Sequence, residues 1–226
     1  MSDSLPWQQI DTVFLDMDGT LLDLHFDNQF WLEHIPLRFA EKHQISVDAA
    51  KQSLYPRFQS LQGTIDWYCV DFWSHELDLD VASLKLELAH LIQIHPHAYE
   101  FLLQLRDHDK RVVLLTNAHH KVVNLKMDVT GLRKHFDELI SSHQFRLPKE
   151  HRDFWTELEK IDPFKKHATL FVDDSLAVLQ AARNYGITHL RGITLPDSQS
   201  GEKALDGFVG ISSFEGLIAD LQNINL

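Results

Sequence analysis

The sequence predicts an α/β fold, in which a doubly wound, Rossmann-like parallel sheet carries a small α-helical cap domain inserted after its first strand. Two observations support this prediction. From residue 111 onward, short apolar runs alternate with stretches of helical periodicity, which is typical of parallel β-α-β units. Residues 24–94, between the first two apolar runs, are instead mostly helical in character and exceed any ordinary strand-to-helix connection.

Five short apolar runs are the candidate strands of the sheet. Nearly continuous apolar character suits strands that are covered on both faces. Helical patterns around 119–130, 150–160 and 175–185 separate the later runs, of which "ELIS" is short enough to be a helix end instead. The five runs are "TVFLD" (12–16), "RVVLLTN" (111–117), "ELIS" (138–141), "TLFVDD" (169–174) and "ITHLRGI" (187–193).

The helical interval predicts the domain organisation. We expect residues 24–94 to form the cap, and residues 1–23 and 95–226 to form the catalytic core, with Pro96 near the start of the next core helix. Runs such as "FWLEHIPLRFAEKH" and "TIDWYCVDFWSHELDLD" supply the cap helices. Ligands of such sheets bind beyond the carboxyl ends of the strands. An insertion that leaves the first strand at that end should cover the site as a lid.

Composition and charge limit the classes of partner. The 226 residues include 21 Lys and Arg against 33 Asp and Glu, for a formal net charge of −12. This balance argues against a nucleic-acid polymer or an anionic membrane as partner, but a small phosphorylated ligand needs only a local positive pocket. No apolar run approaches the ~18 residues of a membrane span, the start lacks a signal-peptide pattern, and the single Cys69 excludes an internal disulfide. We therefore expect a cytoplasmic protein; the oligomeric state is not predicted.

Polar side chains stand where the predicted strands end. Since the carboxyl ends of parallel strands share one edge of the sheet, these side chains should converge there. Buried carboxylates are costly unless they are paired, hydrogen-bonded or bound to a metal. The residues are Asp16 and Asp18 after the first strand, Thr116 and Asn117 at the end of the second, Lys149 after the third, and Asp173 and Asp174 at the end of the fourth.

These residue types suit attack on a phosphate monoester. A carboxylate such as Asp16 can act as nucleophile and form an aspartyl-phosphate. Asp18 can protonate the leaving alkoxide and then deprotonate the hydrolytic water. Thr116 and Lys149 can hold phosphoryl oxygens, and the ammonium group of Lys149 can stabilise the crowded transition state.

A magnesium ion is the cofactor that this chemistry favours. Two unit charges ~4 Å apart interact by ~4 kcal/mol at an effective dielectric constant of about 20, so a carboxylate and a phosphate need a cation between them. Mg²⁺ prefers oxygen ligands. Asp16, Asp173 and Asp174 are the candidate ligands, with backbone or water oxygens completing the shell.

The segments "DMDGT", "LLTNA", "LPKE" and "FVDDS", in this order, resemble the four motifs of the haloacid dehalogenase-like superfamily. The resemblance implies the roles above and adds the backbone carbonyl of Asp18 to the Mg²⁺ ligands. It favours Asp174 over Asp173 as the direct ligand. Because the glycine-rich phosphate loops of other folds are absent from the sequence, we expect the phosphate to be held by Met17, Thr116, Asn117 and Lys149.

Longer segments are similar to the bacterial GMP/IMP nucleotidase branch of that superfamily: "DTVFLDMDGTLLDLHFDNQFW", "DWYCVDFWS", "LLTNAHH" and "LFVDDSLAVL". This likeness implies a purine nucleoside monophosphate as substrate. Helical spacing places Tyr68, Cys69, Phe72 and Trp73 on one packing stripe. Trp67 falls off the stripe and is the aromatic residue that could contact a base, although a Trp without a ligand is the commoner case.

Other functions compete with nucleotide hydrolysis. A sugar-phosphate phosphatase or a phosphomutase would use the same residues. A dehalogenase has little use for Asp18, because a halide leaves without a proton. A receiver module phosphorylated on Asp also gathers acids, a hydroxyl and a lysine, but it places its acid pair after the first strand. In this chain the adjacent pair, Asp173 and Asp174, follows the fourth, so the order favours an enzyme.

Overall fold

The computed structural model describes residues 4–223, and its centre is a parallel six-stranded sheet in the order β3-β2-β1-β4-β5-β6. β1 lies in the middle, between β2 and β4. The predicted α/β fold with a doubly wound parallel sheet is therefore confirmed. The strands are β1 (Thr12–Leu15), β2 (Arg111–Thr116), β3 (Glu138–Ser141), β4 (Thr169–Asp173), β5 (His189–Ile193) and β6 (Gly210–Ile211).

All of the predicted strands are present. The "ELIS" run is β3, and its Leu139 is in register with Leu114 of β2. The sequence analysis missed β6, because two residues are too few to establish a period. Ile211 of β6 is in register with Ile193 of β5, which extends the sheet at that edge.

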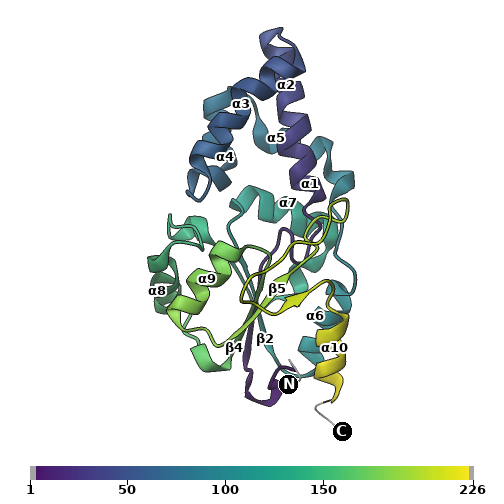
Figure 1. Ribbon diagram of the computed structural model, residues 1–226, viewed down its shortest axis with the longest axis vertical. Helices are drawn as coiled ribbons and strands as arrows, with labels where there is room; N and C mark the ends of the chain where they lie inside the picture. Colours follow the sequence, from purple (N-terminus) through teal and green to yellow (C-terminus); the bar gives the residue numbers. More distant parts are fainter. Residues whose placement is uncertain (1–3, 224–226) are drawn as a thin grey trace.

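Helices cover both faces of the sheet. Side chains of a strand alternate between its faces, so Val13 and Leu15 pack against one helical layer whereas Phe14 packs against the other. The first layer comprises α6 (Ala98–Asp107), α7 (His120–Thr130) and α10 (Glu215–Gln222), and the second α8 (Arg152–Ile161) and α9 (Leu176–Tyr185) (Figure 1). Outside residues 24–94, the short 3-10 helices of the described chain are η1 (Trp7–Gln9), η5 (Leu132–His135), η6 (Ser142–Gln144) and η7 (Lys166–Ala168).

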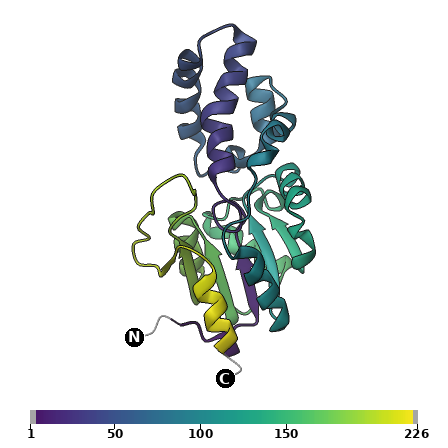
Figure 2. The ribbon, with the colours of Figure 1, turned by 90° about the vertical axis from the view of Figure 1, so that its right-hand side faces the viewer.

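Residues 24–94, between β1 and α6, form a group of helices at one end of the molecule, which we call the helical insertion (Figures 1 and 2). Its own apolar cluster includes Phe30, Leu54 and Trp73, and Val122 of α7 joins that cluster. That this insertion is a domain distinct from residues 1–23 and 95–226 stays a prediction. Its helices are α1 (His25–Gln29), the π-helical η2 (Phe30–His34), α2 (Ile35–His43), α3 (Val47–Leu61), η3 (Asp66–Tyr68), α4 (Val70–Leu77), α5 (Val81–Glu87) and η4 (Ala89–Leu91).

The sequence pattern predicts one continuous helix through "TIDWYCVDFWSHELDLD", and this prediction is wrong at Cys69. This residue is extended (φ −91°, ψ 106°) and separates η3 from α4. Its Sγ accepts a hydrogen bond from the backbone N–H of Phe72 at 3.4 Å, so Cys69 caps the amino terminus of α4. The local cap overrides the apolar periodicity, and Cys69 leaves the packing stripe on which the sequence analysis placed it.

Candidate active site

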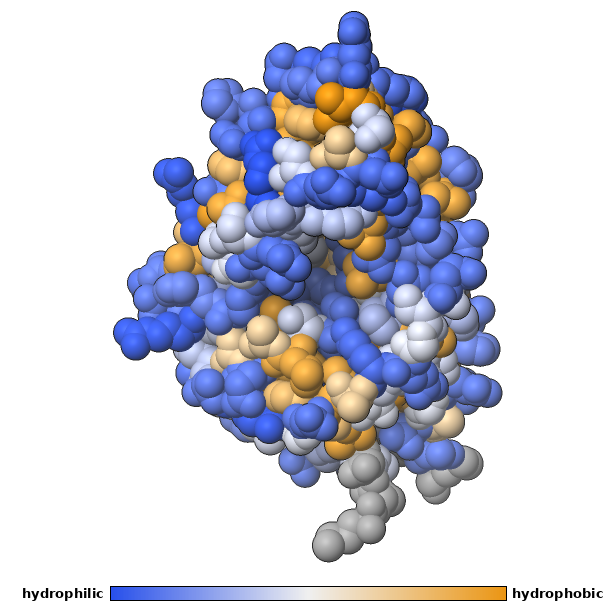
Figure 3. Space-filling view, turned by 45° about the horizontal axis from the view of Figure 1, so that its top comes forward, coloured by the Kyte–Doolittle hydropathy of each residue, from blue (hydrophilic) through white to orange (hydrophobic). Residues whose placement is uncertain are grey.

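A cavity of about 550 Å³ lies between the helical insertion and the carboxyl ends of the central strands. The space-filling view shows a hollow between these two parts of the surface (Figure 3). Asp16, Thr116 and Asp173, at the ends of β1, β2 and β4, line it from the core, and Trp31 and Trp67 line it from the insertion. The side chains at the strand ends therefore meet at one edge of the sheet.

Lys149 is the centre of the charge cluster in the core. Its Nζ lies 2.5 Å from Oδ1 of Asp16 and 2.7 Å from Oδ2 of Asp173, and it donates to the carbonyl oxygen of Leu115 at 2.9 Å. The side chain is only 2% exposed. A buried ammonium group is stable only with such partners, so the contacts fix Lys149 between the two acids.

Burial dominates the protonation of these groups. It raises the pKa of Asp16 to about 6, although the ammonium group of Lys149 lowers it and Asp173 raises it further. The pKa of Asp173 rises to about 6 for the same main reason. For Lys149, burial lowers the pKa, but its two carboxylate partners outweigh burial and raise it. Lys149 therefore stays a cation and is able to stabilise added negative charge.

Asp18 belongs to a second cluster, centred on Lys126 of α7. Lys126 Nζ donates to Oδ1 of Asp18 at 2.5 Å and to Oδ2 of Asp27, and Lys85 Nζ donates to Oδ1 of Asp27 at 2.9 Å. Burial raises the pKa of Asp18 to about 6, against the lowering effect of Lys126. A carboxyl with a raised pKa can carry a proton near neutral pH, as a general acid must.

The sequence analysis missed Lys126, Asp27 and Lys85. A signal for Lys126 was available, because it shares the apolar face of α7 with Val122, Val123 and Met127 and is buried with them. A lysine at helical spacing among apolar residues implies a buried partner. No comparable pattern marks the partner itself, since Asp18 lies 108 residues away in the chain.

The predicted phosphate-binding residues lie in different environments. Thr116 lines the cavity, and its Oγ1 accepts a hydrogen bond from the backbone N–H of Ala118 at 3.0 Å. Both ends of the Asn117 amide are engaged: Oδ1 accepts from the backbone N–H of Lys149 at 2.8 Å, and Nδ2 donates to Glu150 at 2.9 Å. The side chain of Met17 is fully buried in the core, so only its backbone is free to serve a ligand.

Trp67, the predicted base contact, is half-buried in the cavity wall. Its ring stacks on that of Trp31 with centroids 6.2 Å apart, and it meets the ring of Phe58 edge to face at 5.9 Å. All three rings line the cavity. They form an apolar wall of the cavity. The residues that line it at the strand ends are instead polar or charged.

Asp16, Asp173 and Asp174 fit a magnesium ion. One carboxylate oxygen from each lies within 4.8 Å of the others, and hard oxygen ligands are what Mg²⁺ prefers. Gly19 makes room for this group, because a Cβ at that position would lie 2.9 Å from Cγ of Asp174. Burial raises the pKa of Asp174, and Lys203, at 3.0 Å from its Oδ2, opposes this. A Mg²⁺ ion that took the place of the Lys203 ammonium group would relieve the repulsion among the three carboxylates.

Residues 10–186 match the family model of haloacid dehalogenase-like hydrolases, and the chain belongs to this family. The predictions that the chain belongs to this family and that it is a hydrolase are therefore confirmed. Among individual proteins, it is 38% identical over 218 residues to the GMP/IMP nucleotidase YrfG of Escherichia coli, and equally to that of Shigella flexneri. In each case the match covers 96% of this chain and 98% of the relative.

Solved structures support the same fold. A HAD phosphatase from Thermococcus onnurineus superposes with a TM-score of 0.78 at 22% identity and covers 96% of this chain and 98% of its own. L-2-haloacid dehalogenase from Xanthobacter autotrophicus gives a TM-score of 0.64 at 17% identity, with 95% and 99% covered. At these identities the likeness concerns the fold, and the reaction must be argued from the site. Within residues 4–223, no helix is both long and apolar enough to cross a membrane.

Proposed function

We propose that the protein is a Mg²⁺-dependent 5′-nucleotidase that hydrolyses purine nucleoside monophosphates such as GMP and IMP to nucleoside and phosphate, acting in the cytoplasm. The observation that carries the proposal is the division of one cavity into an ionic floor and an aromatic wall. A nucleoside monophosphate has a matching division between phosphate and base. The identity of 38% to GMP/IMP nucleotidases over nearly the whole chain supports the same substrate class.

In the proposed first step, an Oδ of Asp16 attacks the phosphorus atom and the bond from phosphorus to the nucleoside oxygen breaks. Asp18 gives its proton to the departing alkoxide, which leaves as the nucleoside. The ammonium group of Lys149, 2.5 Å from Asp16, holds the nucleophile in place and balances the charge that gathers on the phosphoryl oxygens. Thr116 lies at the same edge of the sheet and can donate its hydroxyl to one of these oxygens.

In the second step, water attacks the aspartyl-phosphate at Asp16. Asp18 removes the proton of the water, and the bond from Asp16 to phosphorus breaks, so phosphate is released and both carboxyl groups return to their first state. Each step thus uses Asp18 in the opposite protonation state. Its pKa of about 6 allows both states near neutral pH.

Asp16, Asp174 and the backbone carbonyl of Asp18 would hold the magnesium ion, with Asp173 binding it directly or positioning its neighbours. When bound, Mg²⁺ offsets the repulsion between the carboxylates and the substrate phosphate. Asp173 is already engaged by Lys149 and by the backbone N–H of Ser175 at 2.8 Å, which favours Asp174 as the direct ligand.

We further propose that the helical insertion is the cap that selects the substrate. Tyr68 of η3 reaches the core and donates to Oε1 of Glu150 at 2.9 Å, and Lys121 of α7 donates to Oδ1 of Asp71 at 2.6 Å. Both contacts join the insertion to the rest of the chain and would break if the insertion moved away. Closure over the substrate would exclude water from the first step.

Phosphate release from a panel of monoesters, with Mg²⁺ and with EDTA, tests the proposal. The panel includes GMP, IMP, AMP, pyrimidine monophosphates and sugar phosphates. We expect Mg²⁺-dependent release mainly from GMP and IMP. Release mainly from sugar phosphates would discard the nucleotidase assignment, and isomerisation of sugar phosphates without release would identify a mutase.

A variant of the aromatic wall sharpens the assignment of the base. Trp67→Ala should raise the KM for GMP about tenfold, since stacking on an aromatic ring contributes about 1–3 kcal/mol. The KM for a small sugar phosphate should stay the same, because such a substrate does not reach the wall. Leu32→Ala, in the same cavity wall but without a ring, is the matched control. An equal rise in KM for both substrates would contradict a base contact at Trp67.

A further inference from the structure

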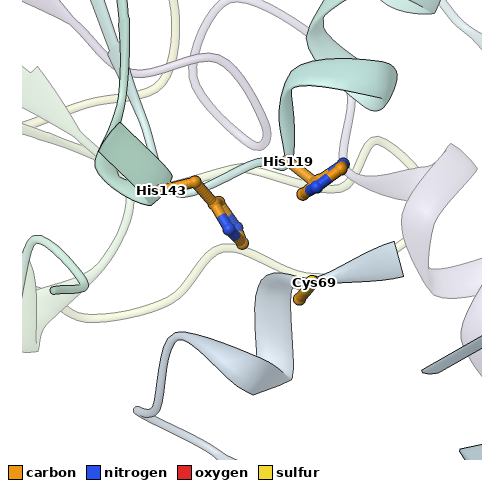
Figure 4. A group of neighbouring side chains, drawn as sticks. All are labelled: Cys69, His119 and His143. Atoms are coloured by element: carbon orange, nitrogen blue, oxygen red, sulfur yellow. The ribbon is translucent and has the colours of Figure 1, made fainter. Parts of the chain in front are cut away.

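Three metal-ligating side chains meet at the border between the helical insertion and the core. Cys69 precedes α4 of the insertion, His119 precedes α7, and His143 lies in η6. One potential ligand atom from each lies within 4.8 Å of the others. Figure 4 shows that the three come from separate elements and that the ring of His143 points toward Cys69. The proposed reaction uses none of them.

One ring nitrogen of each histidine in this cluster lacks a hydrogen-bond partner among the described residues. Nδ1 of His119 and Nε2 of His143 are buried and have no hydrogen-bond partner among the described residues. His119 as a whole is only 6% exposed. Buried polar atoms without a partner are rare in proteins and suggest a missing ligand. Burial also lowers the pKa of His119 to about 4, and it lowers that of His143 against the raising effect of the backbone of Asn117 and Tyr68, so the neutral form of both rings is favoured.

The surroundings of His119 suit a metal ligand. Its Nε2 lies 3.7 Å from Oδ2 of Asp71, and a carboxylate beside the second ring nitrogen is the usual support of a histidine that binds a metal. The ring of His119 meets that of His143 at 88°, with centroids 4.9 Å apart, so the two rings are not stacked on each other.

The spacing and the donor types select the ion. Zn–S bonds of about 2.3 Å and Zn–N bonds of about 2.0 Å place neighbouring tetrahedral ligands about 3.3–3.6 Å apart. Small rotations of the side chains would bring atoms within 4.8 Å to that spacing. One thiolate and two imidazoles favour Zn²⁺ and similar thiophilic ions over Mg²⁺, which requires oxygen.

We propose that Cys69, His119 and His143 form a binding site for a thiophilic divalent cation such as Zn²⁺, with the fourth position open to water. Binding replaces the thiol proton of Cys69, which is released to solvent, by a metal–sulfur bond. The bound ion ties the insertion to the core. Tyr68 and Val70, on either side of Cys69, line the cavity. An ion at this site therefore restrains the cavity wall and slows turnover, a consequence that rests on the proposed function.

Titration with Co²⁺ in the presence of saturating Mg²⁺ tests the binding site without any assay of activity. A thiolate–cobalt charge-transfer band should appear at one equivalent of Co²⁺, and Zn²⁺ should abolish it. Cys69→Ser should remove the band, while its hydroxyl can still accept the hydrogen bond that caps α4. His143→Ala should weaken Co²⁺ binding at least tenfold.

Two control variants separate this site from other metal-binding groups. His75→Ala, on α4 but with a side chain that is 88% exposed, should keep the band, and so should Asp174→Asn in the acidic group. Absence of the band in the unchanged protein, its persistence in Cys69→Ser, or its loss in Asp174→Asn would overturn the proposal. The band does not depend on the substrate. The test of the metal site is therefore independent of the nucleotidase assignment.

The proposed restraint of the insertion by the bound ion has its own test. One equivalent of Zn²⁺ should lower kcat several-fold in the unchanged protein and much less in Cys69→Ser, with Mg²⁺ saturating in both. Equal inhibition of the unchanged protein and Cys69→Ser would show that Zn²⁺ acts elsewhere. It would overturn the proposal that the ion restrains the insertion.

Discussion

Lys149 and Lys126 are both buried beside a proposed catalytic acid, but their partners come from different parts of the molecule. Lys149 contacts Asp16, Asp173 and a backbone carbonyl, all at the carboxyl edge of the sheet. Lys126 contacts Asp18 from the core and Asp27 from α1 of the insertion. The first cluster therefore contains no residue of the insertion, whereas the second depends on how the insertion lies on the core.

This difference suggests a division of labour. In the proposed reaction, attack by Asp16 requires a fixed geometry, which the parallel strands provide. Proton transfer by Asp18 is useful only when the substrate is enclosed, and the second cluster is complete only when the insertion is in place. Lys126 would thus be a positioning residue that makes the protonation of Asp18 sensitive to the insertion.

Removal of the two acids should have the largest effects. Asp16→Asn should lower the turnover of GMP at least about a thousandfold, because the amide cannot form the aspartyl-phosphate. Asp18→Asn should lower it about a hundred- to ten-thousandfold, the usual range for a general acid and base. Phosphate release and trapping of the phosphorylated enzyme measure both. A turnover above one tenth of normal in Asp16→Asn would refute its role as nucleophile.

Replacement of the two lysines compares the clusters directly, and Lys149→Met should have the larger effect. It should lower kcat/KM about a hundred- to a thousandfold through lost stabilisation of the transition state. It should also lower the free energy of unfolding by about 3–5 kcal/mol, since Asp16 and Asp173 lose their partner in a buried site. Steady-state kinetics and urea unfolding check the two effects. Loss of stability with unchanged kcat/KM would make Lys149 purely structural.

Lys126→Met should lower kcat about tenfold and change its pH dependence. Because Lys126 lowers the pKa of Asp18, its removal should raise that pKa and shift the limb of the pH profile that Asp18 governs to higher pH. Lys85→Met is the control, since Lys85 binds Asp27 without a hydrogen bond to Asp18. A shift of equal size in both variants would argue against a specific action of Lys126 on Asp18.

Asp27→Asn should have the smallest effect of these variants. It should change how the free energy of unfolding depends on pH in acid. Burial raises the pKa of Asp27, but Lys126 and Lys85 outweigh it and lower the pKa to about 2, below the ordinary value of 3.8. A lowered pKa contributes stability above pH 4 that is lost as the pH falls toward 2. The variant should be less stable than the unchanged protein at pH 7 and show a shallower decline of stability in acid. Urea midpoints across this range measure it, with the exposed Asp48→Asn as control.

The sequence predicted the residues that follow from local pattern. Continuous apolar runs locate the strands, and the strand ends in turn locate Asp16, Thr116 and Asp173, because a parallel sheet brings its carboxyl ends together. The Lys126 cluster could not be found in this way, since it depends on how the insertion docks. Lys203 was equally hidden: it lies in a segment with no periodicity, yet it contacts Asp174 across 29 residues of sequence.

Val122 has a consequence for attempts to exchange parts between members of the family. This side chain belongs to α7, but it is buried in the apolar cluster of the insertion beside residues such as Trp73. The boundary between the two parts in three dimensions is therefore not the boundary in the chain. A graft of residues 24–94 onto another scaffold would leave an unfilled space unless the recipient offered a side chain of similar shape at the equivalent position. A chimera designed from the sequence alone would omit that residue, and one designed from the packing would carry it along.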